Sequence, residues 1–336
     1  MAVAYMSNFL IPSPQLYLAP MQGLVDDVMR TILTQLGGFD ACVTEFVRIT
    51  HTVHSRATWL KYMPELANNG LTPAGTPVTM QLLGSDEENM AVNALNAVAC
   101  GVDRIDLNFG CPAPTVNRHE GGAVLLRNPH KIESIVRTLR QRLPEKVMLS
   151  AKMRLGYDNK NLALACAQAI EAGGAQLLTV HARTKVEGYR PPAHWSWLAK
   201  IRQNVHLPMV ANGDVFSLHD YRLIRDISGC DDVMLGRGAV MIPDLARQIA
   251  NDNAGKSVMP LSWDDLLPWI AHFFQLCRYK SDNPKFAVAR LKQWLGMMKS
   301  VYPPALILFE RIRTLQQHDA IAIVLRDGAN HSEIQS

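Results

Sequence analysis

From residue 16 onward the chain alternates between short apolar runs rich in β-branched residues and longer segments with apolar positions at helical spacing. The short runs predict strands near residues 16–19, 41–44, 77–82, 104–107, 147–153, 177–180, 208–211 and 232–235. The longer segments predict helices at residues 26–36, 87–99, 129–143, 162–172, 195–203 and 218–227, whereas segment 46–76 looks like an insertion. Strand–helix alternation implies parallel strands, and eight repeats predict a closed α/β barrel of the (β/α)8 or TIM type.

The pattern changes after a polar linker at residues 251–257, beyond which only helical patterns follow, at 263–279, 284–300, 303–316 and a tail. Pro284 and Pro303 suit the first turns of two of these helices. An apolar stripe at helical spacing is formed by Ala287, Leu291, Trp294, Leu295 and Met298. The chain is therefore predicted to contain an N-terminal extension (1–15), a barrel (16–255) and a small all-helical C-terminal domain (258–336).

The helical part carries a basic face. Lys285, Lys292 and Lys299 recur every seven residues, and residues 278–313 contain eight Lys or Arg against two acidic residues. Such a face is either simply solvated or a surface that binds phosphates. The formal net charge of +4 over 336 residues is too small to decide between these alternatives.

The composition indicates a globular protein of the cytoplasm. Apolar residues make up 48% of the chain, and no run approaches the length that a membrane span needs. The N-terminus lacks a basic segment and contains Pro12 and Pro14, so we expect no signal peptide. The six cysteines form no C-x-x-C motif, which predicts free thiols and no metal site.

Polar residues or glycines follow each predicted strand, at the end where TIM barrels carry their active sites. Any one of them has an ordinary explanation, because strand ends are usually polar, but their repetition predicts a site. Cys111 stands out, in an Asn-x-Gly-Cys-Pro turn after the fourth strand. A thiol held there is either buried and inert or a proton donor, since a thiol with a pKa near 8.5 is mostly protonated at neutral pH. Its place in a rigid turn favours the proton donor.

The strand-end motifs resemble one family in order and spacing. They are LAPMQG, TEFVR, QLLG, NFGCP, KMRLG, HARTKVEGY, ANGDV and MLGRGA, over about residues 16–316. This combination resembles the tRNA-dihydrouridine synthases. The segment KQWL at 292–295 resembles the bacterial subfamily that acts on position 16 of tRNA.

The resemblance implies FMN as the cofactor, NADPH as its reductant, and reduction of the 5,6 double bond of a uridine, with Cys111 as the catalytic acid. Flavins supply the difficult chemistry in such enzymes, while the protein positions them. The implied flavin-binding residues are Pro20, Met21, Gln22, Gln81, Lys152, His181, Asn212, Gly213, Asp214, Gly236 and Arg237. From the residues alone, Lys152 and Arg154 can equally form ion pairs inside the barrel, and His181 can close its core.

The resemblance also implies a tRNA partner held by the helical domain. The implied substrate and tRNA contacts are Arg48, Asn108, Arg183, Tyr189, Arg290, Lys292 and Arg313, with ordinary loop packing as the alternative for Tyr189. We expect a monomer that modifies position 16 in the D-loop, with position 20 or 20a as the alternative. The rival functions are an FMN barrel of the dihydroorotate or dihydropyrimidine dehydrogenase type, an aldolase with Lys152 as the Schiff base, and an RNA-binding barrel without catalysis.

Overall fold

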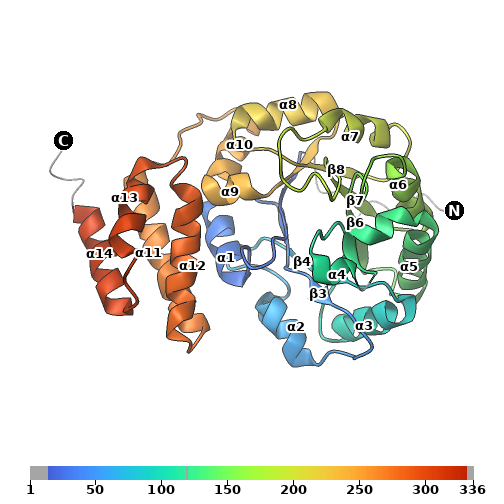
Figure 1. The fold of residues 1–336 in the computed structure, drawn as a ribbon, viewed down its shortest axis with the longest axis horizontal. Coiled ribbons are helices and arrows are strands. Elements are labelled where there is room, and N and C mark those ends of the chain that lie inside the picture. The colour runs from blue at the N-terminus through green and yellow to red at the C-terminus, as the bar shows by residue number, and fades with distance from the viewer. Residues whose placement is uncertain (1–13, 119, 331–336) are drawn as a thin grey trace.

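The computed structural model describes residues 14–118 and 120–330, and a closed barrel of parallel strands forms its centre (Figure 1). The barrel strands are β1 (Leu16–Leu18), β2 (Ala41–Val43), β4 (Val78–Leu83), β5 (Arg104–Phe109), β6 (Met148–Arg154), β7 (Leu177–His181), β8 (Met209–Asn212) and β9 (Asp232–Leu235). Each pairs with its neighbour in parallel, and the ring closes where Tyr17 on β1 lies opposite Met234 on β9. The prediction of a TIM barrel is confirmed.

Helices cover the outside of the barrel (Figure 1). They are α1 (Asp27–Leu36), α3 (Glu87–Ala99), α5 (Pro129–Arg142), α6 (Ala163–Ala172), α7 (Trp195–Arg202) and α8 (Leu218–Ser228). Several begin where the sequence offers a capping side chain: Asp26, Asp86, Asn128 and Ser217 each accept a hydrogen bond from the backbone N–H three residues later. The capping residues therefore mark the starts of these helices close to where the spacing of apolar residues predicts them.

Alternate residues of each strand point into the barrel. A small apolar cluster fills the interior, made of Ala19, Val43, Leu177, Val210 and Met234. Toward the carboxyl ends the inward positions become polar, and these polar residues line a cavity: Gln81, Asn108, Lys152, His181 and Asn212. The cavity therefore lies at the carboxyl ends of the strands.

Segment 46–76 is a compact insertion. It contains the short strand β3 (Val47–Arg48), which pairs with β4, then α2 (Arg56–Tyr62) and the 3₁₀ helix η2 (Pro64–Asn68). A buried ion pair between Arg30 of α1 and Glu65, at 2.8 Å, ties it to the barrel.

The prediction of a linker at 251–257 is wrong for residues 251–253, which are helical. Helix α10 (Leu245–Asn253) follows the short helix α9 (Arg237–Met241) and runs through Asn251–Asn253. Polar residues there hold to α8: Asn253 donates to the hydroxyl of Tyr221 at 2.9 Å, and Asp252 pairs with Arg222. These tertiary contacts override a polar sequence that looks like a linker.

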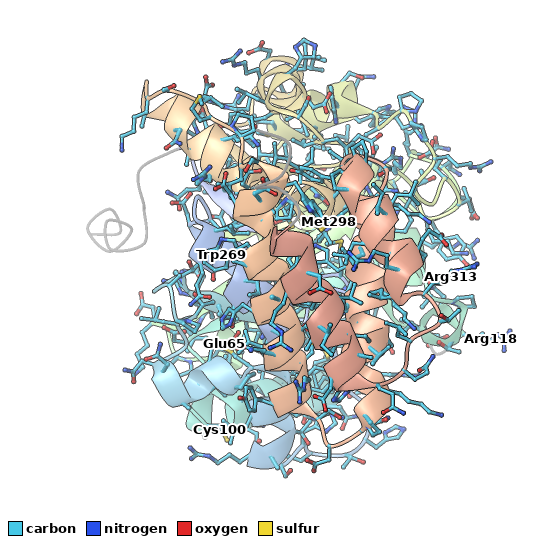
Figure 2. All side chains as sticks on the ribbon, turned by 90° about the vertical axis from the view of Figure 1, so that its left-hand side faces the viewer. Glu65, Cys100, Arg118, Trp269, Met298 and Arg313 are labelled. Atoms are coloured by element: carbon cyan, nitrogen blue, oxygen red, sulfur yellow. The ribbon has the colours of Figure 1, made fainter. Side chains whose placement is uncertain are left out.

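The C-terminal part is a bundle of helices packed beside the barrel (Figures 1 and 2). Its helices are α11 (Trp263–Lys280), α12 (Pro284–Met298), α13 (Pro303–Ile312) and α14 (His318–Asn330). The predicted apolar stripe of α12 is buried, and Pro284 and Pro303 lie in first turns as expected. Trp294, which is 1% exposed, donates from Nε1 to the carbonyl of Val240 at 2.9 Å and joins α12 to α9.

Within residues 14–118 and 120–330, no helix combines the length and apolar character that a membrane crossing requires.

Candidate active site at the carboxyl ends of the strands

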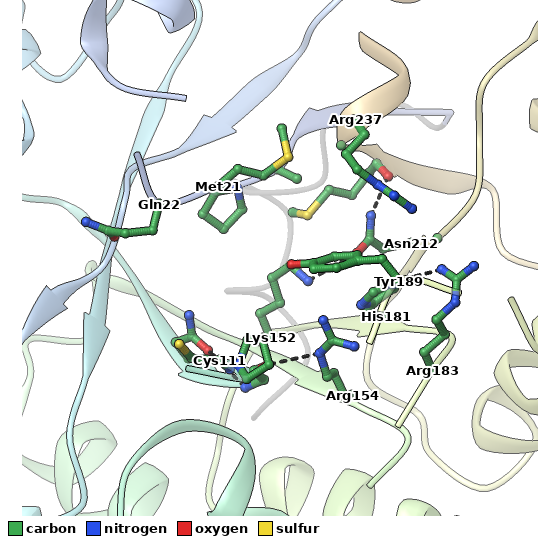
Figure 3. A pocket seen from close by; sticks show the side chains of 18 of the residues that line it. Met21, Gln22, Cys111, Lys152, Arg154, His181, Arg183, Tyr189, Asn212 and Arg237 are labelled. Atoms are coloured by element: carbon green, nitrogen blue, oxygen red, sulfur yellow. Dashed lines mark hydrogen bonds between the residues drawn. The ribbon is translucent and has the colours of Figure 1, made fainter. Parts of the chain in front are cut away.

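A cavity of about 590 Å³ opens at the carboxyl ends of the barrel strands (Figure 3). This volume lies in the range of small-molecule sites. The structure brings together here the following predicted residues: Pro20, Met21, Gln22, Gln81, Asn108, Cys111, Lys152, His181, Arg183, Tyr189, Asn212, Gly213, Asp214, Gly236 and Arg237. Within the described residues, no cluster of His, Cys, Asp and Glu is arranged to hold a metal ion.

Cys111 is held by its turn on both sides. The side-chain oxygen of Asn108 accepts hydrogen bonds from the N–H groups of Gly110 and Cys111, both at 2.9 Å. The amide of Asn117, at the end of α4 (Pro114–Asn117), donates to the carbonyl of Cys111 at 3.0 Å. Gly122 has a φ of 68°, and a Cβ there would lie 2.9 Å from that same carbonyl oxygen, so only glycine fits. These contacts hold the backbone from which the thiol projects.

The environment of Cys111 keeps its thiol protonated. The residue is 8% exposed, and this burial raises its pKa, against smaller opposing effects of the Ala113 N–H and the Arg154 charge. A raised pKa means that the thiol carries its proton at neutral pH. Cys111 can therefore donate a proton, whereas it is a poor nucleophile.

One wall of the cavity is strongly basic (Figure 3). Desolvation, with the neighbouring Arg154 charge, lowers the pKa of Lys152 to about 8, and its Nζ donates to the Asn212 side-chain oxygen at 3.1 Å. Burial and the surrounding cations hold the pKa of His181 well below its usual value, so its imidazole is neutral. Arg237 lies at the same wall. Cations held close together in a cavity favour an anionic ligand.

Arg154 was not among the predicted site residues, although it lies two positions after Lys152 on the same strand. Its Nε donates to the carbonyl of Gly110 at 2.9 Å, and its Nη1 donates to the carbonyls of Thr184 and Gly188 at 3.1 and 3.0 Å. It thus joins the Cys111 turn to the loop after β7. The period of two along β6 was the signal that placed it at the cavity. Phe46 also lines the cavity, and nothing in its sequence context indicated this.

The loop after β7 carries Tyr189 over the cavity. Tyr189 is 52% exposed, and its ring centroid lies 4.8 Å from the guanidinium of Arg237 and 6.1 Å from the ring of His181. Glu187 anchors the loop: it accepts from the Thr184 N–H at 2.6 Å and pairs with His194 at 2.8 Å. Desolvation raises the pKa of Glu187, but the hydrogen bonds from these donors together outweigh it and lower the pKa to about 2. The aromatic ring is therefore displayed at the mouth rather than packed in the core.

Two residues expected to face ligands are paired with each other. Asp214, at a φ of 56°, forms an ion pair with the buried Arg183 and lies 3.5 Å from Arg237. Arg183 is 0% exposed but lines the cavity. The carboxylate of Asp214 orients the two guanidinium groups, and it would repel a phosphate. Both residues line the cavity, and their predicted ligand contacts stay predictions.

Arg290 does not lie on the exposed basic face that the sequence predicted. It is 7% exposed, and its guanidinium pairs with Asp26 at 3.0 Å and donates to the carbonyls of Gly23 and Leu24 at 3.0 and 2.8 Å. Its charge is satisfied inside the protein, at the loop between β1 and α1. Of all the predicted contacts, Arg290 departs furthest from its expected place.

The other three predicted RNA contacts lie outside the cavity. Arg48 is half-buried at the end of β3. Lys292 donates to the carbonyl of Leu315 at 2.7 Å, whereas Arg313 is exposed and pairs with Glu310, three residues before it, at 3.1 Å. Figure 2 shows Arg313 on the same side of the molecule as Arg118, an exposed residue of the loop after Cys111.

Comparison with known proteins matches residues 17–300 to the family "Dihydrouridine synthase (Dus)". A tRNA-dihydrouridine(16) synthase of Neisseria meningitidis serogroup A is 62% identical over 311 residues, which cover 93% of this chain and 93% of that protein. A protein of the same name from Aquipseudomonas alcaligenes is 50% identical and covers 91% of this chain and 97% of its own. Among solved structures, histamine dehydrogenase from Rhizobium sp. 4-9 has a TM-score of 0.53 at 15% identity, with 81% of this chain covered. The match covers 50% of that larger protein and bears on the barrel fold alone. With the family matched over most of its length, this chain belongs to the dihydrouridine synthase (Dus) family.

Proposed function

We propose that the protein reduces uridine 16 in the D-loop of tRNA to 5,6-dihydrouridine, with FMN as the hydride donor and NADPH as the reductant of FMN. The observation that carries the proposal is the identity of 62% over 93% of the chain to a relative named as a tRNA-dihydrouridine(16) synthase. The geometry supports it independently, because a protonated thiol, a basic wall and an exposed aromatic ring meet at one cavity.

The cavity fits FMN in size and charge. A ligand with a phosphate and a ring system needs a cationic end and an apolar wall, and here Arg237 supplies the charge while Pro20 and Met21 supply the wall. Arg237 follows β9, in the phosphate-binding region common to TIM barrels. When bound there, FMN would supply a hydride for C6 of the base. Lys152 would place positive charge beside the ring, and Gln81 would offer an amide N–H.

The thiol of Cys111 donates a proton to C5 of the uracil ring in this proposal. The raised pKa keeps that proton in place before the reaction, and the turn holds the sulfur at the cavity. Asn108 has an amide N–H available for a carbonyl of the base. The base must leave the folded RNA to reach the cavity, and the exposed ring of Tyr189 at the mouth can stack on it.

The helical domain at 258–336 would select the position by holding the whole tRNA. Lys285, Lys299 and Arg313 are exposed there and can contact phosphates, whereas Lys292 is half-buried against the end of α13. Arg48 and Lys292 also remain candidate tRNA contacts, although both side chains are half-buried. We further propose that the protein acts as a monomer in the cytoplasm, where its tRNA substrate lies and where its six free thiols stay reduced.

The decisive measurement is the map of dihydrouridine in tRNA from a strain that lacks the gene. We expect dihydrouridine to disappear at position 16 and to return when the gene is restored. Retention at position 16 with loss at 20 or 20a would place the activity elsewhere in the D-loop. Unchanged tRNA would contradict the proposed reaction altogether.

The phosphate site gives a second prediction. Arg237→Ala should weaken FMN binding about tenfold or more, because it removes a charge-assisted contact to a dianion worth about 1.5–3 kcal/mol. The flavin-to-protein ratio after gel filtration measures this. Arg222→Ala is the matched control, because Arg222 is an exposed arginine that pairs with Asp252 on the outside of the barrel. Equal flavin content in both variants would show that Arg237 does not hold the phosphate.

A further inference from the structure

A chain of polar side chains runs from the interior of the barrel to the turn of Cys111. Asp106 on β5 is 3% exposed, and its carboxylate accepts hydrogen bonds from Gln81 Nε2 and Ser150 Oγ, both at 2.7 Å. Gln81 Oε1 in turn accepts from Asn108 Nδ2 at 2.8 Å. Asn108 Oδ1 then accepts from two backbone N–H groups of the turn, that of Cys111 among them. The turn of the acid is therefore connected to a carboxylate deep in the barrel.

The direction of every hydrogen bond in this chain is determined at the Cys111 turn, because the backbone N–H groups of Gly110 and Cys111 can only donate to Asn108. Gln81 must therefore turn its NH₂ group to Asp106, and Asn108 must turn its oxygen to the turn. Flipping either amide would place two donors or two acceptors together in a buried site, which is strongly disfavoured.

Both oxygens of Asp106 act as hydrogen-bond acceptors. Desolvation raises the pKa of Asp106, and the hydrogen bonds from Gln81 and Ser150 and the charge of Lys152 offset this only in part. Ser150 supports this arrangement, because its hydroxyl donates to one oxygen while Gln81 donates to the other.

The orientation of Asn108 has a consequence for the cavity. Its NH₂ group carries two hydrogens, and one of them is used by Gln81. Among the described residues the second has no partner, and Asn108 lines the cavity. The side chain can thus give a donor to a carbonyl of a bound base, provided that the chain of hydrogen bonds keeps its direction.

We propose that Asp106, supported by Ser150, is a positioning residue for the reaction: through Gln81 and Asn108 it holds the turn of Cys111 and directs a donor of Asn108 into the cavity. The inference rests on the proposed function, in which Cys111 is the acid. Asp106 is not among the residues that line the cavity, so it acts only through the residues between.

The first test compares Asp106→Ala with Asp106→Asn in the full-length flavoprotein. In single-turnover reduction of saturating tRNA we expect Asp106→Ala to be about 10–100-fold slower, as for lost outer-shell partners and small misplacements. Asp106→Asn should stay much closer to the wild-type rate, because its oxygen still accepts from Gln81 while its NH₂ donates to Ser150. The KM for tRNA, whose binding surface lies elsewhere, should change little. An unchanged rate in Asp106→Ala would overturn the proposal.

The second test needs no tRNA. Iodoacetamide labelling followed by peptide mass spectrometry reports the reactivity of each cysteine. In Asp106→Ala we expect faster labelling of Cys111 alone, with Cys42, Cys166, Cys230 and Cys277, which are all buried, unchanged. Faster labelling of all five would indicate general loosening and would contradict a positioning role.

Two further variants complete the design. Ser150→Ala makes a smaller change in the same chain and should raise Cys111 labelling in the same direction, even if Asp106→Ala does not fold. Thr179→Ala is the matched control, because Thr179 is 3% exposed on β7 but takes no part in the chain of hydrogen bonds. If the wild type forms no dihydrouridine, the proposed function fails, and the labelling pattern still decides whether Asp106 holds the turn.

Discussion

Cys111→Ala is expected to slow uridine reduction by about 10²–10⁴-fold, the usual effect of losing a positioned general acid. The thiol lies at the cavity and keeps its proton because burial raises its pKa. Flavin content and NADPH oxidation without tRNA should stay close to wild type, since neither needs this proton. Dihydrouridine formation under single-turnover conditions is the measurement.

Cys100→Ala is the control for the loss of a thiol. Cys100 is half-buried at the end of α3, outside the cavity, and its replacement should leave the rate unchanged. If Cys111→Ala forms dihydrouridine at nearly the wild-type rate, the proton comes from another group or from water.

Arg290→Ala is expected to lower the free energy of unfolding by about 1–3 kcal/mol, the range for leaving buried hydrogen-bonding groups without a partner, because Asp26 keeps its ion pair with Lys280 at 2.9 Å. The change leaves the carboxylate of Asp26, whose side chain is 10% exposed, without its guanidinium partner, and it frees the carbonyls of Gly23 and Leu24. The loop that they belong to also carries Pro20 and Met21, so flavin content should fall as well. Urea denaturation with paired flavin measurements tests both effects.

Arg311→Ala on the exposed side of α13 is the control for losing an arginine from the helical domain, and it should change stability by less than about 0.5 kcal/mol. A stability loss in Arg290→Ala no larger than this would contradict the role assigned to the pair. If Arg290 instead contacts RNA, its replacement would weaken tRNA binding without destabilising the fold.

The Arg290 effect should depend on pH. Desolvation raises the pKa of Asp26 in the folded protein, but the charges of Arg290 and Lys280 outweigh this and lower the pKa. A depressed folded-state pKa gives stability that is present above the unfolded value of about 3.9 and is lost as the pH falls through the folded value. The difference between wild type and Arg290→Ala should therefore shrink in acid.

The sequence predicted the barrel well because its signals are local. An apolar period and a capping residue specify a strand or a helix within a few positions, and β9 has the predicted bounds. Strand β5 extends beyond its predicted end because Asn108 and Phe109, which look like turn residues, pair in register with Lys152 and Met153. The two-residue strand β3 is too short to show any period.

The roles of individual site residues were harder to predict, because partners decide them. Arg290 meets Asp26 from 264 positions away, and Arg183 meets Asp214 from 31 positions away. A basic residue at the expected spacing looks the same whether it faces solvent or a buried carboxylate. The position of Cys111 was predictable for the opposite reason: its turn is built from its own neighbours, Asn108, Gly110 and Asn117.

The loop between β1 and α1 is a single strip of backbone with two attachments. One side of it lines the cavity, and the other side accepts hydrogen bonds from Arg290 and Gln293 of α12. Chimeras that graft the helical module of one relative onto the barrel of another would cut through this joint. A graft that transfers α12 without the loop segment 23–26 would separate the guanidinium of Arg290 from the carboxylate of Asp26. Exchange of position specificity between relatives by recombination would thus require the loop and the helix to travel together.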